Sequence, residues 1–136
     1  MLVYALAGDV LGHQDYRAWL DRTLRGGEVV GVSDLALSGF LRITTNPKVT
    51  RAPLGIEQAH AVIDAVRDHP GVIVATAGAR HWSIFRDLCI SANAKGNLVA
   101  DAYHAAIAIE HNADFVTTDG DFARFPGLRW HHLLRS

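Results

Sequence analysis

The sequence contains little of what marks a secreted, membrane-bound or strongly charged protein. Its single cysteine, Cys89, cannot form a disulfide within the chain, which favours a core thiol in a reducing, cytoplasmic compartment. No apolar run reaches the ~18 residues of a membrane span, and the N-terminus lacks the basic start of a secretory signal. The formal net charge is −1 with neutral histidines, so no overall basic field indicates nucleic acid. An enzyme that gathers basic residues around an acidic site remains open.

Two cofactor signatures are also absent. The glycines follow neither the P-loop pattern nor GxGxxG, so a nucleotide cofactor is not supported. The eight histidines include no pair with the spacing of zinc ligands. His104 and His111 lie on one face of a predicted helix, and we interpret both as surface residues. The sequence therefore argues against nucleotide-dependent and zinc-dependent chemistry.

The pattern that is present is typical of one α/β domain spanning residues 1–136. Periodicity and helix-ending residues predict helices over 13–25, 34–43, 56–68, 80–92 and 98–111. Short apolar runs predict strands over 28–32, 72–75, 114–117 and 128–130. Alternating strands and helices predict a parallel sheet covered by helices on both faces. Residues 1–7 are apolar and are followed by Gly8, which we interpret as a helix end.

Two aspartates are predicted to meet at the carboxyl edge of this sheet. Asp101 lies ten residues before the end of the 98–111 helix, a rise of about 15 Å. Asp119 lies five residues beyond Asp114, about 16 Å along an extended chain. Because the helix and the strand run in opposite directions, both carboxylates return to the same level. Open α/β folds place their sites at this edge.

Each aspartate also has a structural interpretation. Asp101 falls in the first turn of its helix, where the helix dipole favours a negative charge, and Asp119-Gly120 is a common turn dipeptide. Taken together at one edge, the two become candidate ligands for Mg²⁺ or Mn²⁺, which needs only one or two carboxylates besides substrate phosphate. Asp121 is a third candidate acid of the catalytic site. Such an ion can polarise a phosphodiester and activate water.

Three segments carry a family resemblance that covers essentially the whole chain in order. They are Asn97–Ala106 (NLVADAYHAA), Phe115–Phe125 (FVTTDGDFARF) and Ser33–Val49 (SDLALSGFLRITTNPKV). They resemble the motifs of VapC-type toxins, which belong to the PIN-domain ribonucleases. The resemblance implies a three-layer fold with a parallel sheet flanked by helices. It also implies a Mg²⁺- or Mn²⁺-dependent endoribonuclease, the toxin of a toxin–antitoxin system, that forms a homodimer and is blocked by a VapB-type antitoxin.

Two departures from the family pattern affect the expected site. PIN domains begin with a strand that ends in an aspartate, followed by a helix that Leu2–Ala5 resembles. We therefore expect the chain to be N-terminally truncated, without its first strand and that aspartate. The second departure is Gly39, at a position where many relatives have a glutamate. Asp34 lies five residues earlier, and whether it replaces that glutamate is left open.

The expected truncation keeps a second function open. A catalytically inactive, truncated PIN domain would act as an antitoxin- or RNA-binding module rather than as an enzyme. A third class, the phospho-acceptor receiver domain, also gathers acids at a sheet edge. It needs an acidic pair near its start and a lysine after its last strands, and the sequence has neither.

Two groups of basic and aromatic residues offer further candidates for RNA contact. The first group comprises Arg42, Lys48 and Arg51. The second group comprises Arg80, His81, Trp82, Phe85 and Arg86. Solvated charge is the ordinary interpretation of the first group, and contact with backbone phosphate is the alternative. Stacking on single-stranded RNA is the alternative for the aromatic residues, which we interpret as core.

Overall fold

The elements follow the predicted alternation of strands and helices. The computed structural model describes residues 2–5, 13–49, 52–117 and 119–132. Its elements in chain order are β1 (Leu2–Ala5), α1 (His13–Arg25), β2 (Val29–Val32), α2 (Asp34–Thr44), α3 (Ile56–Arg67), β3 (Val72–Val74), α4 (His81–Ser91), α5 (Asn97–Glu110), β4 (Asp114–Thr117), the 3₁₀ helix η1 (Gly120–Arg124) and β5 (Trp130–His132). None of the helices in these ranges combines the length and apolar character that crossing a membrane requires.

The strands form one parallel sheet in the order β3-β2-β1-β4-β5. β1 lies in the middle, with Tyr4 opposite Gly31 of β2 on one side and Phe115 of β4 on the other. This contradicts our expectation of a helix at residues 1–7 and of a missing first strand, because Leu2–Ala5 fills the central position. Gly8, the expected helix end, lies outside the described residues. The order also differs from the 2-1-3-4-5 order of receiver domains.

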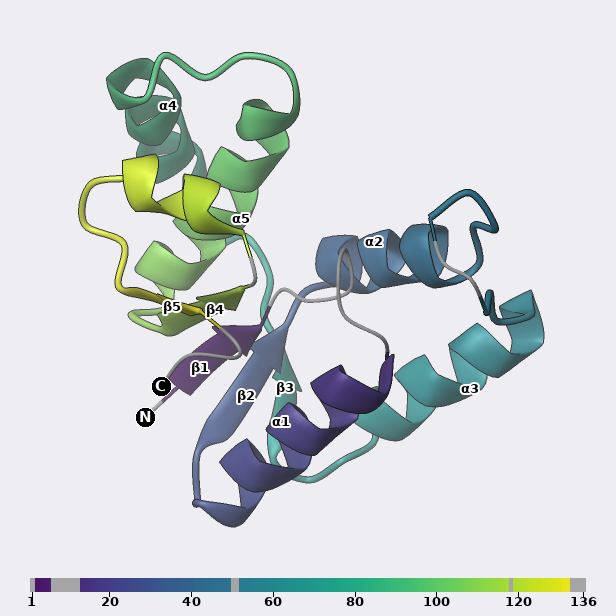
Figure 1. The fold of residues 1–136 in the computed structure, drawn as a ribbon. Helices are drawn as coiled ribbons and strands as arrows, with labels where there is room; N and C mark the ends of the chain where they lie inside the picture. Colours follow the sequence, from purple (N-terminus) through teal and green to yellow (C-terminus); the bar gives the residue numbers. More distant parts are fainter. Residues whose placement is uncertain (1, 6–12, 50–51, 118, 133–136) are drawn as a thin grey trace.

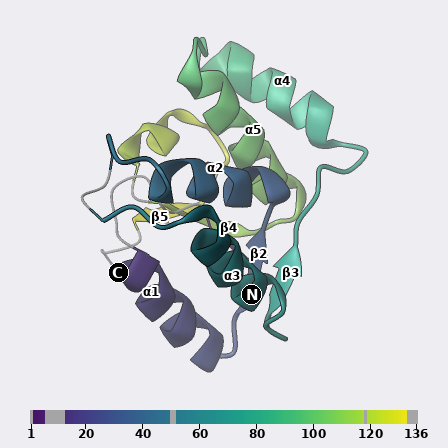
Figure 2. The same cartoon turned by 90° about the vertical axis from the view of Figure 1, so that its right-hand side faces the viewer.

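Helices cover both faces of the sheet (Figures 1 and 2), and each layer of helices packs on its own apolar core. The first core joins α1, α2 and α3 to the sheet through residues such as Trp19, Phe40 and Ile63. The second joins α4, α5 and η1 to the other face. Neighbouring residues of β4 divide between them, since Val116 belongs to the first core and Phe115 to the second. The alternation of side chains along a strand therefore supports a layer of helices on each face.

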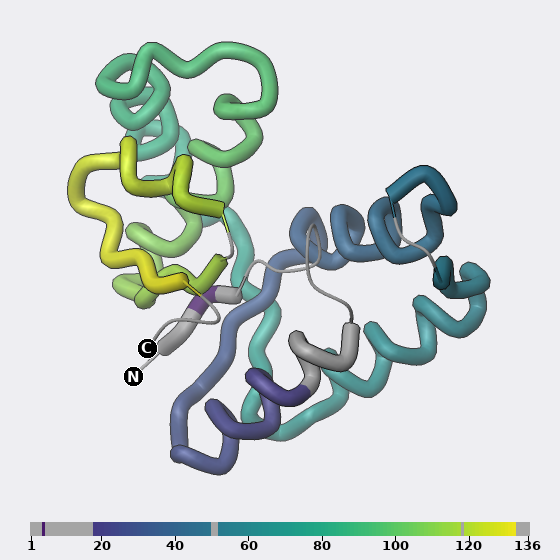
Figure 3. Tube along the Cα trace, in the orientation of Figure 1, coloured from purple at the N-terminus to yellow at the C-terminus, as the bar shows by residue number. Residues whose placement is uncertain are grey.

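The chain changes from one face to the other after β3. Figure 3 shows the segment that follows β3 crossing from the α1–α3 side to α4. Before this point the chain builds most of the first core, and after it most of the second. α5 fits closely under α4 because small residues, among them Ala102, Ala105 and Ala106, form its buried face.

A row of stacked aromatic rings holds η1 against the sheet. Tyr4 stacks on Phe115 with 5.3 Å between ring centroids, and Phe115 stacks on Phe122 of η1 at 4.5 Å. All three side chains are fully buried. Such pairs add to the stabilisation from apolar burial. The row fixes the position of the turn that contains Asp119 and Asp121.

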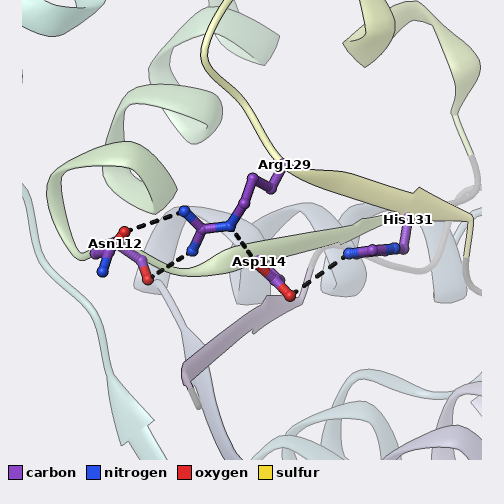
Figure 4. Close-up of polar contacts among 4 residues, drawn as sticks. All are labelled: Asn112, Asp114, Arg129 and His131. Carbon is purple, nitrogen blue, oxygen red and sulfur yellow. Dashed lines mark hydrogen bonds and ion pairs between the residues drawn. The ribbon is translucent and has the colours of Figure 1, made fainter.

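At the opposite end of β4, a polar cluster ties β4 to β5 (Figure 4). Arg129 Nε donates to Asp114 Oδ1 at 2.6 Å, and the same guanidinium donates to the side chain and backbone oxygens of Asn112. His131 Nε2 lies 3.5 Å from Asp114 Oδ2. Asp114 begins β4, so this cluster lies at the amino end of the strand, away from the edge where Asp119 follows it. We interpret it as a structural clamp on the edge strand.

Candidate active site

A groove of about 940 Å³ opens where the carboxyl ends of the strands meet α2 and α5. Residues of α2, the α4–α5 connection, the first turns of α5, the end of β4 and η1 line it. The strand order reverses direction around β1, since β2 lies on one side of it and β4 on the other. Ligands of open α/β sheets bind at such a switch point. The groove therefore lies where this topology favours a binding site.

The three predicted acids, Asp101, Asp119 and Asp121, all line this groove. Asp101 lies on α5, with its side chain partly exposed. Asp119 is the N-cap of η1, where its Oδ1 accepts from Asp121 N at 2.9 Å and its own N–H donates to Thr117 Oγ1 at 3.1 Å. The turn interpretation of Asp119 is thus confirmed, and the cap fixes where its carboxylate lies. Asp121 is exposed and lies 4.0 Å from Arg124 Nε.

The carboxylate oxygens in the groove suit a hard cation that keeps part of its water, rather than an ion enclosed entirely by protein ligands. In the described ranges, no three or more His, Cys, Asp or Glu side chains are arranged to hold an ion. Asp121 therefore does not complete a three-acid cluster with Asp101 and Asp119. Two carboxylates and water, completed by substrate phosphate, form a common coordination set for Mg²⁺. The site is compatible with Mg²⁺ or Mn²⁺ bound together with a phosphodiester.

Gly39 leaves open space on the α2 side of the groove. It lines the groove, and among the described residues a Cβ built at this glycine would meet no atom within 4 Å outside its chain neighbours and the backbone of its own helix. Asp34, five residues earlier, is not among the groove residues. Its exposed carboxylate instead accepts from Arg67 Nη1 of α3 at 3.1 Å. Asp34 therefore does not take the position that a glutamate at residue 39 would fill.

Gly39→Glu is expected to raise the affinity of the protein for Mn²⁺ roughly tenfold or more. Even residues that only hydrogen-bond to the metal ligands change metal affinity by about 10- to 100-fold. The new carboxylate would enter the groove that Asp101 and Asp119 also line. Isothermal titration with MnCl₂ measures the change. Gly39→Gln, which adds the same bulk without charge, is the matched control, and an equal gain in this control variant would contradict the electrostatic explanation.

The sequence interpretation missed the environment of His104. The sequence predicts a surface position for His104, yet this residue is buried, and its Nδ1 lies 2.8 Å from Tyr4 Oη. The surface interpretation holds better for His111, whose Nε2 donates to the carbonyl of Thr76 at 2.8 Å. Tyr4 lies on β1, which was not expected to be a strand. Without that strand, the sequence held no signal for a partner of His104.

The basic and aromatic candidates divide between the groove and the rest of the surface. Arg42 lines the groove, as do Lys95 and Arg124, which carry no recognisable signal in the sequence. Lys48 is exposed outside the groove, and Arg51 lies outside the described residues. Among the described residues, the cations that line the groove are therefore those of α2, the α4–α5 connection and η1.

The second group lies on and beside α4, away from the groove. Its residues are Arg80, His81, Trp82, Phe85 and Arg86. Phe85 is half-buried and packs against the second core, and His81 is buried. The core interpretation is wrong for Trp82, which is 68% exposed.

Cys89 packs against the second core, as predicted. Burial raises the pKa of its thiol, which disfavours the reactive thiolate at neutral pH. A catalytic cysteine is therefore not supported.

Comparisons with known proteins agree with this geometry. The PIN domain family matches residues 1–128. The chain is 41% identical to ribonuclease VapC43 of Mycobacterium tuberculosis (strain H37Rv) over 134 residues, 98% of this chain and 91% of that protein. Ribonuclease VapC25 of the same strain is 38% identical over 129 residues, with 95% and 91% covered.

One solved structure has the same fold across nearly the whole chain. It is a crystal structure of VapBC2 from Rickettsia felis bound to a DNA fragment from its promoter, with a TM-score of 0.69. The match covers 97% of this chain and 98% of that one at 19% identity. The relatives thus align along almost all of this chain, and this coverage does not support the expected truncation. On its sequence and its fold, the chain belongs to the PIN-domain family of VapC ribonucleases.

Proposed function

We propose that this VapC ribonuclease hydrolyses phosphodiester bonds of RNA in the groove at the switch point of its sheet, with Mg²⁺ or Mn²⁺ held by Asp101 and Asp119. The observation that carries the proposal is the convergence of three acids from α5 and from the end of β4 on one groove. The same groove contains three cations, Arg42, Lys95 and Arg124. This mixture suits a polyanion that binds together with a divalent ion.

Each group has a separate role in the proposed reaction. Asp101 and Asp119 hold the ion, which when bound polarises the phosphodiester and lowers the pKa of an attacking water. Arg42 and Lys95 contact RNA phosphates on either side of the groove and keep the scissile bond near the acids. Asp121, exposed and next to Arg124, supports the site from its rim. The oxygen of water forms a new P–O bond and releases a proton, the P–O bond to the leaving ribose oxygen breaks, and that oxygen takes up a proton in turn.

Removal of divalent ions is expected to stop cleavage. Purified protein with MgCl₂ or MnCl₂ should cut a structured, end-labelled RNA, and the same protein with excess EDTA should leave it intact on a denaturing gel. Comparing the two ions measures which is preferred. Equal cleavage with and without EDTA would contradict the metal-dependent mechanism.

The catalytically inactive alternative loses part of its structural basis. It depended on the absence of the first strand and of the aspartate at the end of that strand. β1 occupies the place of the strand between β2 and β4, whereas the four residues of β1 include no acid. The two functions give different results in the cleavage assay, since a binding module would retain RNA or antitoxin without cutting.

We also propose that the chain binds a VapB-type antitoxin, forms a homodimer and acts in the cytoplasm, where its RNA substrates are. The antitoxin proposal is supported by family membership and by the fold shared with a chain of the VapBC2 complex. An antitoxin segment that enters the groove would compete with RNA for Arg42 and Lys95. Co-purification with the product of an adjacent antitoxin gene and the mass of the free protein by light scattering measure both associations.

A further inference from the structure

A buried chain of hydrogen bonds lies beside the groove and is not used by the proposed mechanism. Tyr4 Oη lies 2.7 Å from Ser33 Oγ and 2.8 Å from His104 Nδ1. The three residues come from β1, the N-cap of α2 and the middle of α5, and their exposed fractions are 1%, 4% and 7%. Buried polar groups in such a network have defined partners and orientations. We call these three residues the tyrosine network.

The partners of Ser33 indicate the direction of these hydrogen bonds. Ala36 N donates to Ser33 Oγ at 3.0 Å, so this oxygen is already an acceptor. If Ser33 then donates to Tyr4 Oη, the phenol donates to His104 Nδ1, and every proton in the chain has an acceptor. In the opposite direction, the hydroxyl proton of Ser33 would have no acceptor among the described contacts. This assignment leaves the imidazole proton of His104 on Nε2.

The other ring nitrogen of His104, Nε2, lies on the groove side of the tyrosine network. His104 is among the residues that line it. Within the part of the chain that the structure describes, Nε2 of His104 makes no hydrogen bond to protein. It is also absent from the fully buried atoms without a hydrogen-bond partner, so part of its surface stays open. This nitrogen therefore keeps contact with the groove. Asp101 lies three residues earlier on α5, on the same helical face. The N–H of His104 is thus presented beside a proposed metal ligand.

The imidazole stays uncharged at neutral pH. Burial lowers its pKa to about 4, so the ring is a neutral donor rather than a cation. A nitrogen that carries a proton cannot bind a metal ion, and the other nitrogen is occupied by Tyr4. The group that suits this N–H is an acceptor brought in by the substrate.

We propose that His104 is a residue of the RNA site whose Nε2–H donates a hydrogen bond to a non-bridging phosphate oxygen of the bound RNA, with Tyr4 and Ser33 as positioning residues. The inference rests on the proposed ribonuclease function and deepens it. The donor is next to Asp101, where the ion would draw the scissile phosphate, and it adds no charge that would repel the ion.

Two substitutions test the roles of the two ring nitrogens separately. His104→Asn keeps a polar group near the position of Nδ1, where it can still contact Tyr4, and removes the donor at Nε2. His104→Gln reaches further and places an amide N–H near the Nε2 position. We expect kcat/KM for RNA cleavage to fall about 10- to 100-fold with His104→Asn, as for a lost hydrogen bond to a charged group, and to return towards the wild-type value with His104→Gln. Tyr4→Phe, outside the groove, is expected to lower kcat/KM in the same direction.

Two binding measurements provide readouts independent of turnover. The affinity for MnCl₂, measured by titration, should be unchanged in all variants. The affinity for a short fluorescein-labelled RNA in EDTA, measured by anisotropy, should fall in the His104→Asn variant and recover in the His104→Gln variant. Circular dichroism melting checks that each variant is folded.

The outcomes distinguish this inference from the proposed function. If the wild type cleaves RNA, Asp101→Asn does not, and His104→Asn cleaves like the wild type, the inference alone is wrong. A loss of Mn²⁺ affinity in the His104→Asn variant with unchanged RNA affinity would also overturn it, because His104 would then act on the ion. If the wild type neither cleaves nor binds RNA, the proposed function itself fails.

Discussion

Asp101→Asn and Asp119→Asn are each expected to lower kcat/KM for RNA cleavage about a thousandfold or more. A bound divalent ion contributes several kcal/mol to stabilising the charge of the transition state, and about 4 kcal/mol corresponds to a factor of about a thousand. Asparagine keeps the size of the side chain but removes the charge that we propose holds the ion. Initial rates on labelled RNA at a fixed MnCl₂ concentration measure the loss, and titration should show weaker Mn²⁺ binding in the same variants.

Two other aspartates serve as graded controls. Asp121 lines the groove but is exposed beside Arg124. Asp121→Asn should therefore lower kcat/KM only about tenfold, the smaller effect of a group that does not coordinate the ion. Asp34 is paired with Arg67 outside the groove, and Asp34→Asn should leave cleavage unchanged. If Asp34→Asn were as inactive as Asp101→Asn, the ion would have to be placed nearer to α2.

The free energy of unfolding is expected to fall by about 3 kcal/mol between pH 7 and pH 4 through His104 alone. Burial lowers the pKa of His104 from 6.5 to about 4 in the folded protein, whereas in the unfolded chain it keeps its ordinary value. Between these two values the unfolded state binds more protons. The stabilisation is therefore complete above the unfolded pKa of 6.5 and is lost as the pH falls towards 4.

Urea unfolding at a series of pH values, for the wild type and His104→Asn, measures this contribution as a difference. The groups near the ring are the hydroxyls of Tyr4 and Ser33 and, along the groove, Asp101 and Asp119. They are present in both proteins, so the difference isolates His104. His60→Asn, which removes an exposed histidine of α3, should retain the wild-type slope. Parallel curves for the wild type and the His104→Asn variant would show that His104 does not stay neutral in the folded state.

The helices and the acidic site could be read from the sequence because their signals are local. The predicted 56–68 and 98–111 helices match α3 and α5 within about one residue, and the predicted 34–43 helix is α2, which Ser33 caps by accepting from Ala36 N. The last strand begins at Trp130, two residues later than predicted. That Asp101 and Asp119 line one groove follows from helix rise and strand length, and both quantities are fixed by backbone geometry.

The features that the sequence could not reveal depend on long-range pairing. Leu2–Ala5 was assigned to a helix by resemblance, and it becomes β1 because β2 and β4 offer hydrogen-bonding edges on both sides. The burial of His104 depends on Tyr4, which is 100 residues away along the chain. Trp82 has the aromatic character of a core residue, yet α4 turns it to solvent.

The central position of β1 has a consequence for synthesis of the protein. β1 is made early but pairs with β4, more than 100 residues later, and contacts of such long sequence separation form late. α1, α2 and α3 can pack on β2 and β3 while the remainder is still being translated. The groove also needs Asp119, so a nascent chain on the ribosome has no assembled site for RNA until β4 has emerged and docked.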